Sequence, residues 1–287
     1  MLFKPIGDNI NVMSLSFLRM NNGDIGALYI CKILDGTDRA FLVRSSDEGQ
    51  TWSKPVNCME SLKQQDYFVV NNDRVIKLKS GRIIFPASRH STIKKDEEFA
   101  YGKINFFVSD DDGYTWRKTD LEIDYPFKES DHGWQEPGIY ELPDGRLWCW
   151  CRTNLGCQFE CFSSDEGETW SNINPNYFFT APLSPMQVKN VGEFTVAIWN
   201  PIPASIVRPE SEPWGRTPFV LAVSYDRGIT FNKEDIYYLE YDLTHGYCYP
   251  SVIEGDDYFL VGYYYSNENG HCLANNKIIK IKYDEIR

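Results

Sequence analysis

One octet of residues occurs four times along the chain and constrains its fold more than any other feature. The pattern is Ser-x-Asp-x-Gly-x-Thr followed by Trp or Phe, and four copies in register are not a chance event. The Ser and Asp side chains of such an octet can bond nearby backbone amides, and its Gly adopts a positive φ, so each copy predicts a hairpin turn. The copies occupy residues 45–52, 109–116, 163–170 and 224–231.

A second hairpin pattern precedes the octets and occurs five times. It consists of an apolar strand, a polar turn with a glycine, and another apolar strand, with the turns at Gly23, Gly81, Gly145, Gly192 and Gly255. The repeating unit is therefore four short antiparallel strands, and repetition of such units is typical of a β-propeller. We expect an all-β fold, a β-propeller of four-stranded antiparallel blades with five repeats, forming a single domain over residues 1–287.

Composition excludes several classes of partner. The chain carries 29 Lys and Arg against 41 Asp and Glu, a net charge of −12, which disfavours nucleic acid and anionic membrane surfaces as partners.

The chain has no apolar run of the roughly 18 to 20 residues that span a membrane and no apolar segment near its first residue. We therefore expect no signal peptide, a cytoplasmic location and reduced thiols for the eight cysteines. Because no metal-binding spacing of Cys or His occurs, we expect no metal and no cofactor.

The octet resembles the Asp-box, or BNR repeat, of the sialidase (neuraminidase) superfamily, and the resemblance covers nearly the whole chain. Propellers of that superfamily have six blades, whereas five repeats are counted here. The resemblance leaves two readings open: either the family's first blade has no counterpart here, or the first repeat of this chain is that first blade. A natural five-bladed form, a truncated gene product and a fragment are three explanations that the sequence leaves open.

The resemblance also implies a set of site residues. Sialidase substrates carry a carboxylate at the anomeric carbon, which would repel a carboxylate nucleophile, so the family uses a tyrosine that a glutamate activates. Tyr249 matches the tyrosine and Glu136 the glutamate. Arg152 and Arg216 match two of the three arginines that clamp the substrate carboxylate, because a guanidinium can donate two parallel hydrogen bonds to it.

Two parts of the family's site have no clear match. The strand at residues 12–16 lacks the first arginine. For the aspartate that acts as acid and base, Asp38 and Asp35 lie in the loop before the first octet, and Asp73 is an alternative.

The segment around Asp73 starts the inner strand of the second repeat. It supplies Asn72 and Arg74 as candidate substrate contacts, although a structural ion pair between Asp73 and Arg74 explains the segment equally well. Trp134, close to Glu136, either stacks on a sugar or caps a loop.

These residues predict an exo-acting glycoside hydrolase of sialidase type, with a terminal sialic acid or related acidic sugar as its carbohydrate substrate. One alternative is a catalytically impaired or truncated Asp-box propeller that only binds glycans. Another is a propeller hydrolase or lyase for a different acidic saccharide, such as a uronic-acid polymer. The oligomeric state does not follow from the sequence.

Overall fold

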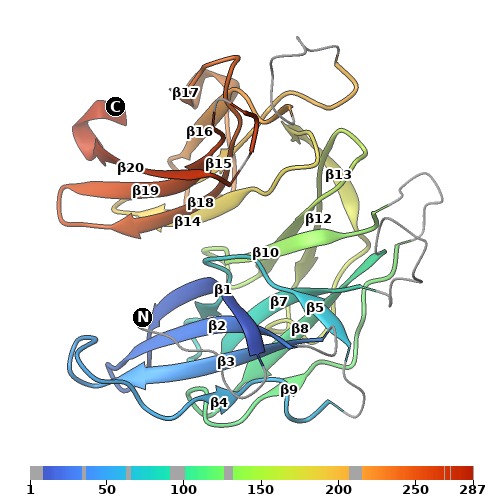
Figure 1. Cartoon of the computed structure of the whole chain (residues 1–287), viewed down its shortest axis with the longest axis vertical. Coiled ribbons are helices and arrows are strands. Elements are labelled where there is room, and N and C mark those ends of the chain that lie inside the picture. Colours follow the sequence, from blue (N-terminus) through green and yellow to red (C-terminus); the bar gives the residue numbers. More distant parts are fainter. Residues whose placement is uncertain are drawn as a thin grey trace. The chain divides into compact units, whose positions relative to one another are not determined.

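The computed structural model describes residues 9–33, 37–62, 66–90, 101–125, 132–206, 215–267, 269–271 and 273–286. The chain divides into two compact units (Figure 1). The first comprises Met1–Glu141, Gly145–Leu147 and Ser163–Ser171, and the second comprises Leu142–Asp144, Trp148–Phe162 and Asn172–Arg287. The single domain expected over residues 1–287 stays a prediction.

Two antiparallel sheets occupy the early part of the chain. The first has the order β1-β2-β3-β4, formed by Asn9–Arg19, Ile25–Ile33, Asp38–Ser45 and Val56–Asn57. The second has the order β5-β7-β8-β9, formed by Tyr67–Val69, Ile83–His90, Gly102–Ser109 and Arg117–Lys118, and the short strand β6 (Ile76–Lys77) also pairs with β7.

Three further sheets follow along the chain. The third is β10-β11-β12-β13, formed by Gln135–Glu141, Leu147–Arg152, Cys157–Ser163 and Asn174–Thr180. The fourth is β14-β15-β16-β17, formed by Gln187–Val191, Phe194–Trp199, Phe219–Ser224 and Ile236–Glu240. The fifth is β18-β19-β20, formed by Tyr247–Glu254, Tyr258–Tyr265 and Asn275–Lys282. These five sheets confirm the all-β fold class and the antiparallel blades of a β-propeller.

Each octet begins on the last residue of the third strand of its sheet and forms the expected turn. In the second copy, Ser109 Oγ donates to Asp111 Oδ1 at 2.8 Å and accepts from the Gly113 amide at 2.7 Å. The backbone amide and the side-chain hydroxyl of Thr115 both donate to the Asp111 carboxylate. The same bonds recur in the other three copies. In the first copy, hydrogen bonds from Thr51 are the main cause that lowers the pKa of Asp47 to about 2.

Large aromatic side chains fill the core of each unit. In the first unit, Phe85 stacks on Phe107 with ring centroids 5.0 Å apart and contacts the octet residue Trp116. In the second unit, Phe179 lies edge-on to Trp199 at 5.1 Å and also contacts Phe231, the last residue of the fourth octet. Since the final octet residue packs into the core in both units, the octet anchors the turn as well as shaping it.

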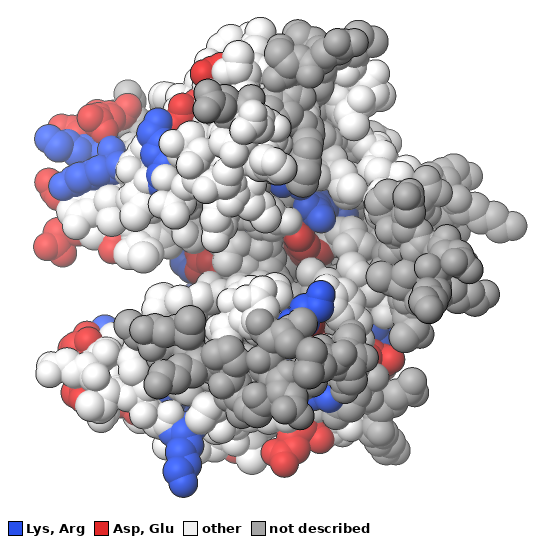
Figure 2. All heavy atoms as spheres, in the orientation of Figure 1, with Lys and Arg blue, Asp and Glu red and all other residues white. Residues whose placement is uncertain are grey.

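The strand β20 ends the fifth sheet and pairs only with β19 among the described residues. Figure 2 shows charged side chains of both signs over this part of the second unit. On β20 itself, Lys277, Lys280 and Lys282 are exposed. Lysine on an edge strand disfavours pairing with a further strand, because association would bring its charge out of water.

We predict that Asp111→Ala destabilises the first unit by about 1–3 kcal/mol, because the substitution removes the carboxylate that accepts three hydrogen bonds in the turn. The measurement is the midpoint and slope of urea unfolding. Asp120→Ala is the matched control, because Asp120 is exposed and outside the octet, and we expect a change within about 0.5 kcal/mol. Equal losses in the two variants would show that the octet turn does not depend on its aspartate.

Candidate active site

Eight non-glycine residues in the described ranges have a positive φ, and they form two sets by their place in the repeat. The first set holds the fourth residue of each octet: Glu48, Asp112, Glu166 and Arg227. The second set lies within or just after the first strand of a sheet: Ser14, Asp73, Glu136 and Tyr249. Three of these four are residues predicted for catalysis, and a left-handed backbone is uncommon for such side chains.

A break in strand pairing accompanies the left-handed residue in two of these strands. The register between β1 and β2 shifts between Met13 and Ser16, and that between β18 and β19 shifts between Cys248 and Ser251. Such a bulge turns a side chain away from the regular alternation of the strand. The repeat therefore provides the same kind of backbone position several times, and the residue at that position differs from one repeat to the next.

In the first unit, the predicted residues of neighbouring inner strands lie side by side. The Asp73 amide donates to the Leu15 carbonyl at 3.1 Å, and the Arg74 amide donates to Ser16 Oγ at 2.8 Å. The Asn71 amide side chain donates to Glu136 Oε2 at 3.4 Å. Glu136 is 8% exposed and Asn71 6% exposed. The structure thus brings Glu136 next to the polar segment that contains Asn72, Asp73 and Arg74.

Asp38 is the first residue of β3. Lys32 of β2 pairs with Asp38 on one side and with Asn11 of β1 on the other, so Asp38 lies at the end of the sheet where β1 begins. Asp38 is only 3% exposed, and its Oδ1 accepts no hydrogen bond from the described residues. Burial raises its pKa to about 6, although the nearby charges of Lys32 and Arg39 act in the opposite direction. Burial and the negative charge of Asp38 in turn raise the pKa of Tyr67. Asp35 lies outside the described residues.

Trp134 does not fit the predicted role of a sugar-stacking residue. Its side chain is fully buried, its Nε1 donates to the Asp124 carbonyl at 3.1 Å, and its ring packs edge-on against Tyr125 with centroids 4.5 Å apart. Because no face of the indole ring is exposed, Trp134 fixes the residues directly before β10 against Asp124 and Tyr125. Of the two readings left open by the sequence, the structure favours the loop cap.

In the second unit, the structure brings Arg216 and Tyr249 together. The Arg216 guanidinium carbon lies 5.6 Å from the centroid of the Tyr249 ring. Arg216 is 6% exposed, and its Nη2 donates to the Leu183 carbonyl at 3.4 Å. Its own carbonyl accepts from the Asn200 side chain at 2.9 Å and from the Tyr247 amide at 2.8 Å. These bonds fix the backbone of Arg216 beside the start of β18.

The second unit also separates two tyrosines that the sequence does not distinguish. Tyr247 is 5% exposed and packs in the core against Phe219 and Tyr263, and burial raises its pKa to about 12. Tyr249 is half-buried and has a φ of 56°. Arg152, also half-buried, ends β11.

Glu136 belongs to the first unit, whereas Arg152, Arg216 and Tyr249 belong to the second. A common pocket for all four stays a prediction.

Two interactions of the predicted residues were not foreseen from the sequence. Asn71 bonds to Glu136, and Tyr67 lies close enough to Asp38 to respond to its charge. The polar run around Asn71 was a signal for the first contact, since it starts an inner strand. No signal in the sequence connects Tyr67 with Asp38, because the two residues lie on the third strand of one sheet and the first strand of the next.

The described residues contain no group of three His, Cys, Asp or Glu side chains that could hold a metal ion. None of the helices within the described ranges has the length and apolar character needed to cross a membrane. The seven described cysteines are buried, and none is in a disulfide bond with another described residue.

Comparison with known proteins identifies the family. The BNR repeat-like domain matches residues 14–264. A sialidase of Bacteroides fragilis (strain YCH46) is 24% identical over 261 residues, which cover 87% of this chain and 43% of the relative. The anhydrosialidase of Macrobdella decora is 32% identical over 137 residues, covering 46% of this chain and 16% of the relative. The chain thus spans less than half the length of the curated relatives it matches.

The fold is also that of a solved sialidase-type structure. The intramolecular trans-sialidase from Ruminococcus gnavus, in complex with oseltamivir carboxylate, has a TM-score of 0.67 and 18% sequence identity, covering 88% of this chain and 52% of that one. The chain belongs to the BNR repeat-like domain family and is an Asp-box β-propeller of the sialidase superfamily, with the fold of sialidase-type glycoside hydrolases.

Proposed function

We propose that the protein is an exo-acting glycoside hydrolase that releases a terminal sialic acid or a related acidic sugar from a carbohydrate. The observation that carries the proposal is the contact between Arg216 and Tyr249. A buried guanidinium beside a half-buried phenol pairs the two functions that this chemistry needs, a charged donor for the substrate carboxylate and a nucleophile that is not a carboxylate.

Several residues have assigned roles in the proposed reaction. Tyr249 attacks the anomeric carbon, Glu136 accepts the phenol proton, and Arg152 and Arg216 hold the substrate carboxylate. Asp38 donates a proton to the leaving oxygen, with Asp73 as the alternative acid. Water then hydrolyses the bond between the sugar and Tyr249, and the products are the free acidic sugar and the shortened carbohydrate. The relatives named above are a sialidase and an anhydrosialidase, which supports this substrate class.

The direct test is hydrolysis of an aryl α-sialoside by the full chain. The readout is the fluorescence of the phenol that hydrolysis releases. Arg216→Lys keeps the positive charge but loses the two parallel donors, so we expect the KM to rise about 10- to 100-fold, with a smaller change in kcat. Arg227→Lys is the control, since Arg227 is an exposed octet residue of the same unit, and its KM should not change. If Arg216→Lys keeps the KM of the parent chain, Arg216 does not hold the substrate.

One observation favours the second candidate, a propeller that binds glycans without turnover. Ser14 has the left-handed position in the first sheet that Glu136 and Tyr249 have in theirs, and the sequence around it lacks the first arginine of the family's clamp. A clamp with two arginines would hold the substrate carboxylate less firmly. Binding of a sialoside without release of the phenol, over prolonged incubation at high protein concentration, would decide for this candidate. A cytoplasmic location also stays a prediction.

A further inference from the structure

A pocket of about 510 Å³ opens on the first unit at the octet end of β3. Among the residues that line it are Arg44, Trp52, Lys54 and Tyr114. Arg44 follows Asp38 by six residues along the strand, which corresponds to about 20 Å. The pocket therefore lies at the opposite end of the sheet from Asp38. Its volume is within the range of about 300–1,000 Å³ that small-molecule sites occupy.

Comparison of the repeats shows that Arg44 is not a requirement of the octet turn. Arg44 immediately precedes the first serine of its octet, and the residues at this position in the other three repeats are Val108, Phe162 and Val223. The octet bonds are the same in all four copies. An apolar side chain is therefore sufficient for the turn, and the arginine needs a different explanation.

The Arg44 side chain is a buried cation without a carboxylate partner. Arg44 is 8% exposed. Its Nη2 donates to the Asp112 carbonyl at 2.7 Å, and its guanidinium carbon lies 3.6 Å from the centroid of the Tyr114 ring. Within the part of the chain that the structure describes, no carboxylate oxygen comes within 4.0 Å of the guanidinium. Burial of a charge is unfavourable without a counter-ion, so this position is suited to receive an anionic group.

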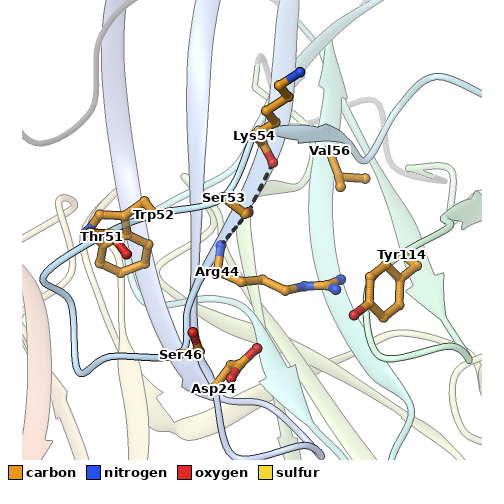
Figure 3. Close-up of a pocket in the computed structure, with 9 residues that line it drawn as sticks. All are labelled: Asp24, Arg44, Ser46, Thr51, Trp52, Ser53, Lys54, Val56 and Tyr114. Carbon is orange, nitrogen blue, oxygen red and sulfur yellow. Dashed lines mark hydrogen bonds between the residues drawn. The ribbon is translucent and has the colours of Figure 1, made fainter.

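Aromatic rings and a second cation complete the pocket (Figure 3). The Arg44 side chain extends from its strand towards Tyr114, and Trp52 lies on the other side. Arg44 covers one face of the Tyr114 ring. Tyr114 is nevertheless 61% exposed, so its ring still presents a large surface to a ligand. Lys54 is exposed and forms no ion pair with a described residue.

One carboxylate, that of Asp24, also lines the pocket. Its Oδ2 accepts from the Asn22 side chain at 2.8 Å, and it does not pair with Arg44 or Lys54. Two cations and one carboxylate give this pocket a local positive excess in a chain whose net charge is −12. The combination of flat aromatic surface, hydroxyl groups and positive charge matches a sugar ring that carries an anionic substituent.

We propose that this pocket is a second carbohydrate site, which binds a saccharide through a carboxylate or sulfate group. Arg44 and Lys54 hold the anionic group, and Tyr114 and Trp52 contact the sugar ring. The site would keep the protein on an acidic glycan by contacts separate from the proposed active site, so binding at the pocket does not depend on turnover. The proposal stands independently of the proposed hydrolase activity.

The test measures binding of four sugars to the full chain that carries Tyr249→Phe, so that no ligand is consumed. The probes are 3′-sialyllactose, glucuronic acid, galactose 6-sulfate and neutral lactose, titrated by calorimetry and by tryptophan fluorescence. We expect saturable binding of at least one acidic sugar and no comparable binding of lactose. The glucuronic acid and sulfate titrations show whether a carboxylate or a sulfate is the preferred group.

The variant Lys54→Ala with Tyr114→Ala removes two exposed side chains of the pocket and leaves the buried Arg44 in place. We expect this variant to raise the Kd of the acidic sugar about tenfold or more. The matched control combines Lys233→Ala with Tyr177→Ala, both exposed side chains of the second unit, and should leave the Kd unchanged.

Three outcomes would overturn the proposal: an unchanged Kd in the pocket variant, equally tight binding of lactose, or no saturable binding of any acidic sugar. Loss of turnover in a separate assay has no bearing on it.

Discussion

Tyr249→Phe should lower kcat/KM for an aryl α-sialoside by a factor on the order of 10³ or more. The substitution keeps the ring and removes only the phenol oxygen, which in the proposed reaction forms the covalent bond to the anomeric carbon. Removal of a covalent nucleophile leaves only the rate that binding and the remaining electrostatic contacts provide. The measurement is the initial rate of fluorescent phenol release at several substrate concentrations.

Tyr247→Phe is the matched control for this prediction. Tyr247 lies two residues earlier on β18, but it is buried in the core against Phe219 and Tyr263. Its removed hydroxyl does not contact the substrate in the proposed reaction, so we expect kcat/KM to change by less than about twofold. If Tyr249→Phe retained full activity while the parent chain hydrolysed the substrate, the tyrosine mechanism would be wrong. A hydrolase or lyase for another acidic saccharide would then be the better explanation.

Asp38→Asn should lower kcat by about 10²–10⁴-fold, the range that a single general acid contributes. A general acid acts only in its protonated form. Because burial raises the pKa of Asp38 to about 6, the group keeps its proton at mildly acidic pH, whereas an ordinary aspartate with a pKa of about 3.9 does not. The parent chain should therefore lose activity as the pH rises through about 6, and Asp38→Asn should remove this limb of the pH profile.

Asp73→Asn provides the comparison for Asp38→Asn. Asp73 is partly exposed and has the left-handed inner-strand position that Glu136 and Tyr249 also have, so it is the alternative acid. If Asp38 is the acid, Asp73→Asn keeps the alkaline limb and most of the activity. If the alkaline limb disappears in Asp73→Asn and persists in Asp38→Asn, Asp73 takes the role and Asp38 is a buried structural carboxyl group. Urea unfolding of both variants shows whether either one acts through loss of folded protein.

The fold was predictable because its signals are local. The hydrogen bonds of an octet join residues no more than four positions apart, as between Asp111 and Thr115, so eight consecutive residues contain the whole turn. The hairpins that precede the octets are also formed by neighbouring segments, such as β14 with β15 and β18 with β19. A pattern of this kind can be recognised without knowledge of any distant contact.

The details of the candidate site were less predictable because they depend on contacts between distant segments. Arg216 and Tyr249 are 33 positions apart, and Asn71 and Glu136 are 65 apart. The resemblance to sialidases suggested that such residues converge, but it did not predict which atoms meet. For Trp134 the sequence left two roles open, since an indole ring serves equally well in a core and on a surface that binds sugar.

The sequence by itself determined the repeat, the antiparallel blade and the superfamily, because the octet and hairpin signals lie within short stretches of chain. Only the tertiary structure decided the burial of individual side chains: it buried Trp134 and Tyr247, placed Asp38 where its pKa rises, and left Arg44 without a carboxylate partner among the described residues. The physical reason is that the burial and charge environment of a side chain depend on the segments packed around it, which the sequence pattern at that residue does not specify.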